Sequence, residues 1–202
     1  MIQKKTGRPR AFDQDKAIEA ALQVFWKKGY DGASMKDLTR AMGVNSPSLY
    51  AVFGDKRQLY LTTIDYYLND DACAPLVAFE SESDIGKAVT AFMRAAIDYA
   101  TCHPSGAKGC FLASCVATTV ESVAGTQERL QQGITGADER LAHRFEQEKE
   151  LGHLPAGFPS LQRARLLFDL RQGHVLRARA GLSRQTMDDD LLWRTRMVLS
   201  DD

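Results

Sequence analysis

Residues 34–56, SMKDLTRAMGVNSPSLYAVFGDK, decide the fold because helix starts and stops follow each other closely there. Ser34 followed three residues later by Asp37 has the form of a capping box, which begins a helix. Gly43 ends that helix, since glycine readily adopts the left-handed conformation found just past a helix end. Asn45 is a good N-cap for a second short helix. The stretch therefore predicts two short helices joined by a three-residue turn.

A longer helix is predicted on each side of this pair. Asp13 is the expected N-cap of the preceding helix, and Gly29 is its expected end. Its apolar side chains recur at helical spacing on one face: Ile18, Ala21, Leu22 and Phe25. Asp55 is expected to cap the following helix, which continues to Leu68. Three helices of this kind form a helix-turn-helix, in which the second short helix presents its N-terminus to a major groove about 12 Å wide.

The remainder of the chain is also predicted to be helical. No alternating run of β-branched residues is present, so strands are not expected. Polar or proline-rich breaks over 80–84, 102–108 and 152–159 separate the expected helices. These helices cover residues 85–101, 110–123, 126–150, 160–180 and 184–199. The prediction is an all-α chain of about nine helices.

Composition excludes some classes of protein and hides an asymmetry of charge. The chain has 44% hydrophobic and 26% charged residues, typical of an ordinary soluble protein. Its net charge is zero, but residues 1–60 contain 11 Lys/Arg and 6 Asp/Glu, so the front is basic and the rest is acidic. A basic front end is consistent with a polyanionic partner. A start with Lys4 and Lys5 predicts no secretory signal, and no apolar run approaches the ~18 residues of a membrane span.

The ordered motifs resemble the TetR family of bacterial one-component repressors between Phe12 and about Tyr67. The resemblance is carried by Ala17-Ile18, Ala21-Leu22, Phe25, Gly29-Tyr30, Ser34-Met35-Lys36-Asp37-Leu38, Ala41-Met42-Gly43-Val44, Ser48-Leu49-Tyr50, Phe53-Gly54-Asp55-Lys56 and Leu59. In the body, Gly109-Cys110-Phe111-Leu112 and Gln172-Gly173 with Arg179-Ala180-Gly181 look like segments of some members. The resemblance implies a homodimer that binds a palindromic operator and is released when a small molecule enters the C-terminal domain.

Three regions are expected on this basis. Residues 1–11 are a basic arm, residues 12–66 are the helix-turn-helix DNA-binding domain, and residues 67–202 bind an effector and dimerise. The last two helices and their mates are expected to form a four-helix interface. The expected function is a cytoplasmic, sequence-specific repressor. The alternative is a helical ligand-binding protein or small enzyme that does not bind DNA.

Small polar and basic side chains in the N-terminal region are candidates for DNA contact. They are Arg8, Arg10, Ser34, Lys36, Asn45, Ser46, Pro47, Ser48, Tyr50 and Lys56. Two arginines in an extended arm suit a narrow minor groove, although the same arm is also typical of a disordered tail. Asn45 and Ser34 have the simpler reading of helix caps, and Tyr50 that of a packing residue.

Residues 67–202 contain candidate effector-pocket residues and cysteines that are candidate reactive thiols. The pocket candidates, taken from their helical faces, are Phe92, Tyr99, Cys110, Phe111, Cys115, Val116 and Phe168. Cys110 opens a predicted helix close to Lys108, which favours a reactive thiol that senses oxidants or electrophiles. The alternative is that Cys110 and Cys115 are small core residues. A metal sensor made of Cys102, His103 and Cys110 is disfavoured, since the spacing matches no familiar zinc pattern.

Enzymatic chemistry is not expected. The chain has no Gly-rich phosphate loop, no H-E-x-x-H and no G-x-S-x-G motif. No catalytic residue, resident metal or cofactor is therefore predicted. The expected partners are double-stranded DNA, a second copy of the chain and a small-molecule effector of unknown identity.

Overall fold

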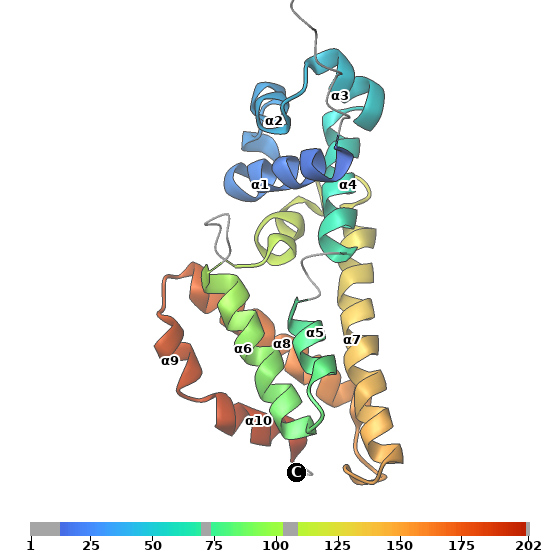
Figure 1. Cartoon of the computed structure of the whole chain (residues 1–202), viewed down its shortest axis with the longest axis vertical. Helices are drawn as coiled ribbons and strands as arrows, with labels where there is room; N and C mark the ends of the chain where they lie inside the picture. Colours follow the sequence, from blue (N-terminus) through green and yellow to red (C-terminus); the bar gives the residue numbers. More distant parts are fainter. Residues whose placement is uncertain (1–12, 70–73, 103–108, 201–202) are drawn as a thin grey trace, which may run out of the picture.

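The computed structural model describes residues 13–69, 74–102 and 109–200, which form helices and contain no strand. Helices α1 to α3 lie together at one end of an elongated molecule, and α4 runs from that end toward the body (Figure 1). Their bounds are α1 Gln14–Gly32, α2 Met35–Met42, α3 Ser46–Phe53 and α4 Lys56–Asn69. The all-α prediction is confirmed for the described residues.

The body is built around the long helices α6, α7 and α8, with shorter helices beside them (Figure 1). Its helices are α5 Ala74–Ser81, α6 Ile85–Cys102, α7 Thr126–Glu150, α8 Ser160–Arg179, α9 Arg184–Asp188 and α10 Leu191–Leu199. Between α6 and α7 lie a π-helical turn, Leu112–Val116, and a 3₁₀ turn, Ala117–Thr119. Among the described helices, none combines the length and hydropathy that crossing a bilayer requires.

The predicted caps of α1 are present. The Asp13 side chain accepts a hydrogen bond from the backbone N–H of Lys16 at 3.3 Å. At the other end, Gly29 has φ 71°, and the Ala33 N–H donates back to the Gly29 carbonyl at 3.2 Å. The regular helix thus ends at Gly29 as expected, and a short turn extends the element to Gly32.

Two body segments differ from the sequence prediction. Helix α5 was not expected, because its eight residues are too few for a reliable periodicity. Its second residue, Pro75, is the local signal that could have found it, since proline favours the first turn of a helix. The expected helix over 110–123 is instead the π and 3₁₀ pair, with the Ala117 N–H donating to the Leu112 carbonyl. Tertiary burial around several sides of this segment overrides a simple 3.6-residue pattern.

The expected final helix over 184–199 is interrupted after Asp188. Three consecutive aspartates, Asp188 to Asp190, occupy the interruption. Their like charges at the C-terminal end of α9 oppose the helix dipole, and aspartate favours caps over helix interiors. Asp190 then precedes α10, where its carboxylate pairs with Arg194 at 2.7 Å.

A cluster of aromatic rings joins the N-terminal helices to the body. Tyr67 of α4 packs edge-on against Trp26 of α1 and against Phe111, with ring centroids 5.6 and 5.5 Å apart. Tyr60, two turns earlier on α4, packs against Phe25 at 4.9 Å. Both tyrosines are fully buried. Such pairs stabilise a contact beyond the area they bury, so α4 is held firmly between α1 and residues 109–119.

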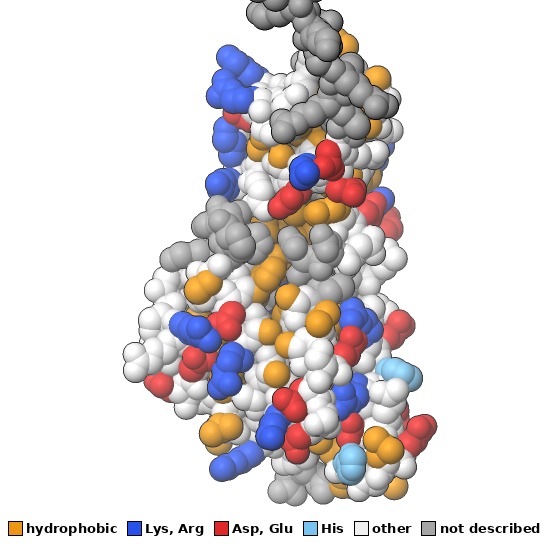
Figure 2. Space-filling model, viewed as in Figure 1, with side chains coloured by type: hydrophobic (Ala, Val, Ile, Leu, Met, Phe, Trp, Pro, Cys, Tyr) orange, Lys and Arg blue, Asp and Glu red, His pale blue; other side chains and the backbone are white. Residues whose placement is uncertain are grey.

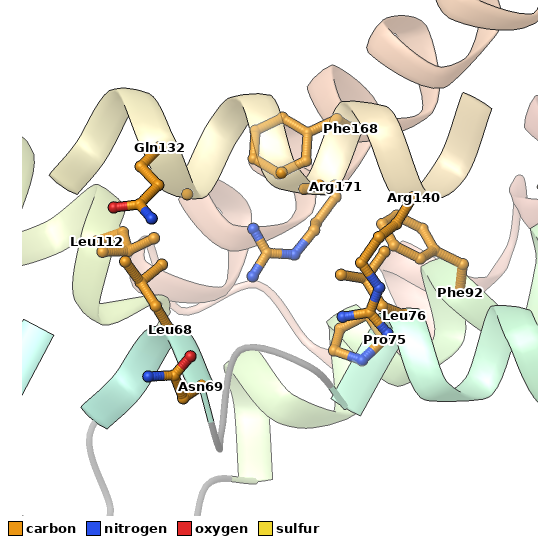
Figure 3. A pocket seen from close by; sticks show the side chains of 13 residues that line it. Leu68, Asn69, Pro75, Leu76, Phe92, Leu112, Gln132, Arg140, Phe168 and Arg171 are labelled. Carbon is orange, nitrogen blue, oxygen red and sulfur yellow. The ribbon is translucent and has the colours of Figure 1, made fainter. Parts of the chain in front are cut away.

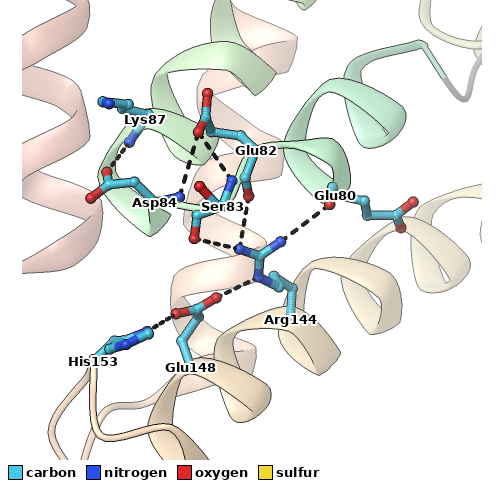
Figure 4. Close-up of polar contacts among 8 residues, drawn as sticks. All are labelled: Glu80, Glu82, Ser83, Asp84, Lys87, Arg144, Glu148 and His153. Atoms are coloured by element: carbon cyan, nitrogen blue, oxygen red, sulfur yellow. Dashed lines mark hydrogen bonds and ion pairs between the residues drawn. The ribbon is translucent and has the colours of Figure 1, made fainter.

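At the far end of the body, Arg144 of α7 holds the connection between α5 and α6 (Figure 4). Its Nη2 atom donates to the carbonyls of Glu82 and Ser83 at 2.9 and 3.2 Å. Its Nε atom donates to Glu148, whose side chain is only 3% exposed, at 2.7 Å. His153 contacts the other oxygen of that carboxylate at 2.7 Å. Burial alone would raise the pKa of Glu148, but His153 and Arg144 more than offset it and keep the pKa below its ordinary value.

Replacing Arg144 is expected to destabilise the protein strongly. Arg144→Ala leaves the buried Glu148 carboxylate with one partner fewer, and the free energy of unfolding should fall by about 3 kcal/mol. Arg140→Ala, one turn earlier, is the matched control because its pair with Glu80 is about 40% exposed on both sides. That control should lose less than about 1 kcal/mol. Urea unfolding followed by circular dichroism measures both, and equal losses would contradict the assigned role of Arg144.

Candidate functional site

The helix-turn-helix predicted from residues 34–56 is present, with its capping box fully formed. The Ser34 hydroxyl accepts from the Asp37 N–H at 3.1 Å, and the Asp37 carboxylate accepts from the Ser34 N–H at 3.1 Å. The Lys28 ammonium lies 2.8 Å from the same carboxylate. Lys28 and Ser34 together hold the pKa of Asp37 well below its ordinary value, so the cap stays ionised at neutral pH. Gly43 then ends α2 in the left-handed conformation, with φ 68°.

Helix α3 lies at the tip of the molecule (Figure 1), and its exposed residues are uncharged. Asn45 caps it, its Oδ1 accepting from the Ser48 N–H at 2.8 Å. Leu49 and Phe53 are buried beneath the helix. The candidate DNA-contacting residues of this segment are all exposed, as predicted: Asn45, Ser46, Pro47, Ser48 and Tyr50. The capping of Asn45 and a role in DNA contact remain compatible, because only one of its amide atoms is used by the cap.

Basic side chains gather along one edge of the N-terminal end of the molecule, over α2 (Figure 2). Lys36 is exposed in the first turn of α2. Lys56 is partly buried, and its Nζ lies 4.6 Å from the centre of the Tyr30 ring, so it already has a structural contact. The two arginines of the expected arm, Arg8 and Arg10, lie outside the described residues.

Two tyrosine–cysteine contacts connect α4 to residues 110–119. The Tyr67 hydroxyl donates to Cys110 Sγ at 3.3 Å, and the Tyr60 hydroxyl donates to Cys115 Sγ at 3.4 Å. Cys115 in turn donates to the Phe25 carbonyl of α1 at 3.4 Å. These contacts join residues 110–119 to α4 and α1, which pack against α3 and α2.

A pocket of about 230 Å³ opens into the body between α4, α5, α6, α7 and α8. Figure 3 shows the side chains around it. Two of the seven candidate pocket residues, Phe92 and Phe168, line it. The other candidates, Tyr99, Cys110, Phe111, Cys115 and Val116, do not line this pocket and lie instead in or beside the adjoining aromatic core. Its lining residues are Leu68, Asn69, Pro75, Leu76, Phe92, Leu112, Gln132, Gly133, Gly136, Ala137, Arg140, Phe168 and Arg171.

Arg171 of α8 is the residue that the sequence reasoning missed. Its side chain is buried, lines the pocket and places Nη2 3.7 Å from Cys110 Sγ. The signal was a charged residue inside the buried stripe of α8. That stripe consists of Ala164, Leu167, Phe168, Arg171, His174, Val175 and Ala178. Charged residues are rarely buried without a functional or pairing reason.

The chemical state of Cys110 depends on Arg171. Burial alone would raise the pKa of the Cys110 thiol, but the Arg171 guanidinium and the Tyr67 hydroxyl bring it below its ordinary value. Burial instead raises the pKa of Cys115. The surroundings of Cys110 therefore favour its thiolate, the reacting form of cysteine, whereas those of Cys115 favour the thiol.

The metal-sensor alternative gains no geometric support. Cys102 is exposed, Cys110 is buried, and His103 lies outside the described residues. Over the part of the chain that the structure describes, no group of three or more His, Cys, Asp or Glu side chains could hold a metal ion.

Comparisons with known proteins give one consistent result. Residues 17–63 match the model of bacterial regulatory proteins of the tetR family. The HTH-type transcriptional repressor ComR of Escherichia coli K12 is 29% identical over 184 residues, which cover 90% of this chain and 87% of ComR. The repressor BdcR of the same organism is 33% identical over 90 residues, 45% of this chain and 46% of BdcR.

A solved structure is similar to this chain in both fold and sequence. A cysteine mutant of the TetR family transcriptional regulator CifR, complexed with 26-bp double-strand operator DNA, is similar with a TM-score of 0.81. It is 27% identical, and the match covers 94% of this chain and 98% of that one. The reduced form of E. coli NemR has the same fold, with a TM-score of 0.79 at 16% identity.

Proposed function

Because this chain belongs to the TetR family of DNA-binding transcriptional regulators, we propose that it represses a promoter by occupying a palindromic operator. It is a regulator rather than an enzyme, as its relatives are. The observation that carries the proposal is the exposed, uncharged face of α3 at the tip of the molecule, with Asn45 capping its N-terminus. ComR and BdcR are both named repressors, which supports repression over activation.

We assign residues 12–66 to DNA binding and residues 67–202 to effector binding and dimerisation. The exposed residues of α3 would face base edges and phosphates, and Lys36 would contact a phosphate beside them. Ser34 would combine capping with a phosphate contact from the same helix end. Lys56 would add positive charge close by, and residues 1–11, with Arg8 and Arg10, would follow the minor groove.

A homodimer is supported by apolar side chains on the outer sides of α8 and α10. Leu176 is 69% exposed, and Leu192 and Trp193 are 68% and 60% exposed. Exposed apolar groups of this size mark protein contacts when they cluster. Pairing two copies through α8 and α10 would form the four-helix interface and place two copies of α3 for two half-sites.

Release from DNA would follow from a small molecule in the pocket or from modification of Cys110. Both would act on α4, because Leu68 and Asn69 line the pocket and Tyr67 contacts Cys110. With a peroxide, the Cys110 thiolate would attack one oxygen, forming an S–O bond as the O–O bond breaks. The products are a sulfenic acid and hydroxide, and the sulfur would no longer fit between Tyr67 and Arg171.

Loss of the Lys36 charge should weaken operator binding and reduce its dependence on salt. Lys36→Ala removes one phosphate contact, so the slope of log K against log salt should fall by about 1. Tyr50→Phe should weaken binding about tenfold, because it removes the hydroxyl that would donate to a phosphate oxygen. Lys87→Ala is the matched control, since Lys87 is also exposed in the first turn of a helix but lies on α6. Fluorescence anisotropy on DNA flanking its own gene, or on DNA selected from a random pool, measures all three. No bound sequence from either source would refute the proposal.

Charge placed on α8 should separate the two copies. Leu176→Glu is expected to give a monomer in analytical ultracentrifugation and to reduce operator affinity by at least about a hundredfold, because two half-sites no longer bind together. Leu151→Glu is the control, as Leu151 is 66% exposed at the end of α7. A dimeric Leu176→Glu protein would show that another surface pairs the copies.

Cys110→Ser should bind operator DNA normally but resist release by hydrogen peroxide or N-ethylmaleimide. The serine hydroxyl is a poor nucleophile at neutral pH, whereas the Cys110 thiolate is stabilised by Arg171. Cys102→Ser and Cys115→Ser serve as controls and should keep the response. Release that persists in Cys110→Ser would remove the thiol from the switch and leave reversible ligand control.

A further inference from the structure

Among the described residues, no carboxylate forms an ion pair with Arg171, a cationic group of the pocket lining. Arg171 is 6% exposed, and among the described residues its single polar contact is Cys110 Sγ at 3.7 Å. A guanidinium has five N–H donors, so one distant thiol sulfur leaves most of them available. Burying a cation without a full set of acceptors is costly, and proteins normally retain such a group only where it meets a counter-charge.

The charges of the pocket lining also favour an anionic ligand. No Asp or Glu is found among the described residues that line it. Arg140 also lines it, but its Nε and Nη2 atoms bind the Glu80 carboxylate at 2.8 and 2.7 Å. Within the described part of the lining, Arg171 is thus a positive charge without a carboxylate partner, and Figure 3 shows its guanidinium pointing into the space between the labelled side chains.

The rest of the lining is apolar on several sides. Leu68, Leu76, Phe92, Leu112 and Phe168 surround the guanidinium, with the Arg171 Cζ atom 5.5 Å from the centre of the Phe168 ring. A volume of about 230 Å³ lies just below the usual range of ligand pockets, about 300–1,000 Å³, so a small occupant is expected. The occupant that fits is a small molecule with an apolar body and one anionic head.

We propose that the effector is a small organic carboxylate, whose head pairs with Arg171 and whose apolar body fills the pocket. The inference rests on the proposed effector control and names the chemical class of the ligand. A carboxylate accepts two parallel N–H bonds from a guanidinium, a geometry that a thiol sulfur does not satisfy. Binding would draw the guanidinium away from Cys110 Sγ, because the carboxylate would compete with that sulfur for the same cation.

The test uses pairs of probes that differ only in charge. Linear carboxylates from butanoate to dodecanoate and 4-phenylbutanoate are compared with their primary amides by isothermal titration calorimetry on the full chain without DNA. At least one carboxylate should bind about tenfold or more tightly than its amide, because a charge-assisted pair is lost in the amide. Amides that bind as tightly as the acids, or a complete absence of binding to 1 mM, would overturn the proposal.

Variants distinguish the contribution of the anionic head of the ligand to binding from that of its apolar body. Arg171→Gln should reduce the acid-to-amide preference to about one, Arg171→Lys should retain part of it, and circular dichroism checks that both fold. Gly136→Leu should weaken acid and amide alike, because Gly136 lines the pocket and a Cβ there meets open space. Cys110→Ser should bind the acid at least as tightly as the wild type, since its competitor for Arg171 is gone. A preference that survives in Arg171→Gln would overturn the assignment of the head group.

The readout on DNA is independent of this binding assay. If the preferred carboxylate binds with Arg171-dependent affinity but no operator is found, the site stands and the repressor proposal fails. If the operator is bound but the carboxylates show no preference over their amides, the repressor stands and the ligand class fails.

Discussion

The packing of α4 between α1 and residues 109–119 is the contact on which the two ends of the molecule depend. Tyr60 and Tyr67 are fully buried there, and buried hydroxyls need hydrogen-bond partners. Their partners are the sulfur atoms of Cys115 and Cys110, with a further contact from Tyr60 to Thr119 at 3.3 Å. The boundary that the sequence suggested at residue 66 therefore runs through a continuous, tightly packed helix. This packing joins the N-terminal helices directly to the body through α4.

In the proposed mechanism, base recognition and electrostatic attraction to DNA are provided by different helices. Helix α3 has no acidic or basic residue in its sequence, SPSLYAVF. Positive charge lies beside it, on Lys36 of α2 and on the partly buried Lys56 of α4. Phosphate contacts position a protein on the duplex, whereas base contacts specify the sequence. An uncharged α3 would leave sequence choice to small hydroxyl, amide and apolar contacts.

The sequence predicted the N-terminal module better than the body, and the reason is physical. The signals in residues 13–56 are local: Ser34, Asn45 and Asp55 cap helices through bonds to residues three positions away. The π-helical turn at Leu112–Val116 has no such signal, because burial against α1, α4 and α7 determines it. The helical faces correctly placed Phe92 and Phe168 in the pocket lining. They did not identify Arg171, because its contact with Cys110 and its place in the lining depend on tertiary structure. The break between α9 and α10 does have a local signal, the acidic run Asp188 to Asp190.

The length of α4 has a consequence for signalling. Its 14 residues form a rod about 20 Å long, with the pocket residues Leu68 and Asn69 at one end and Lys56 at the other. In a stiff rod, a small tilt at one end displaces the other end. A tilt of about 6° about the pocket end moves the opposite end by about 2 Å. Hydrogen bonds to base edges weaken over a few tenths of an ångström. In the proposed mechanism, a lever of this length would convert a small displacement at the pocket into a geometric mismatch at the groove, without any change in the internal structure of α1 to α3.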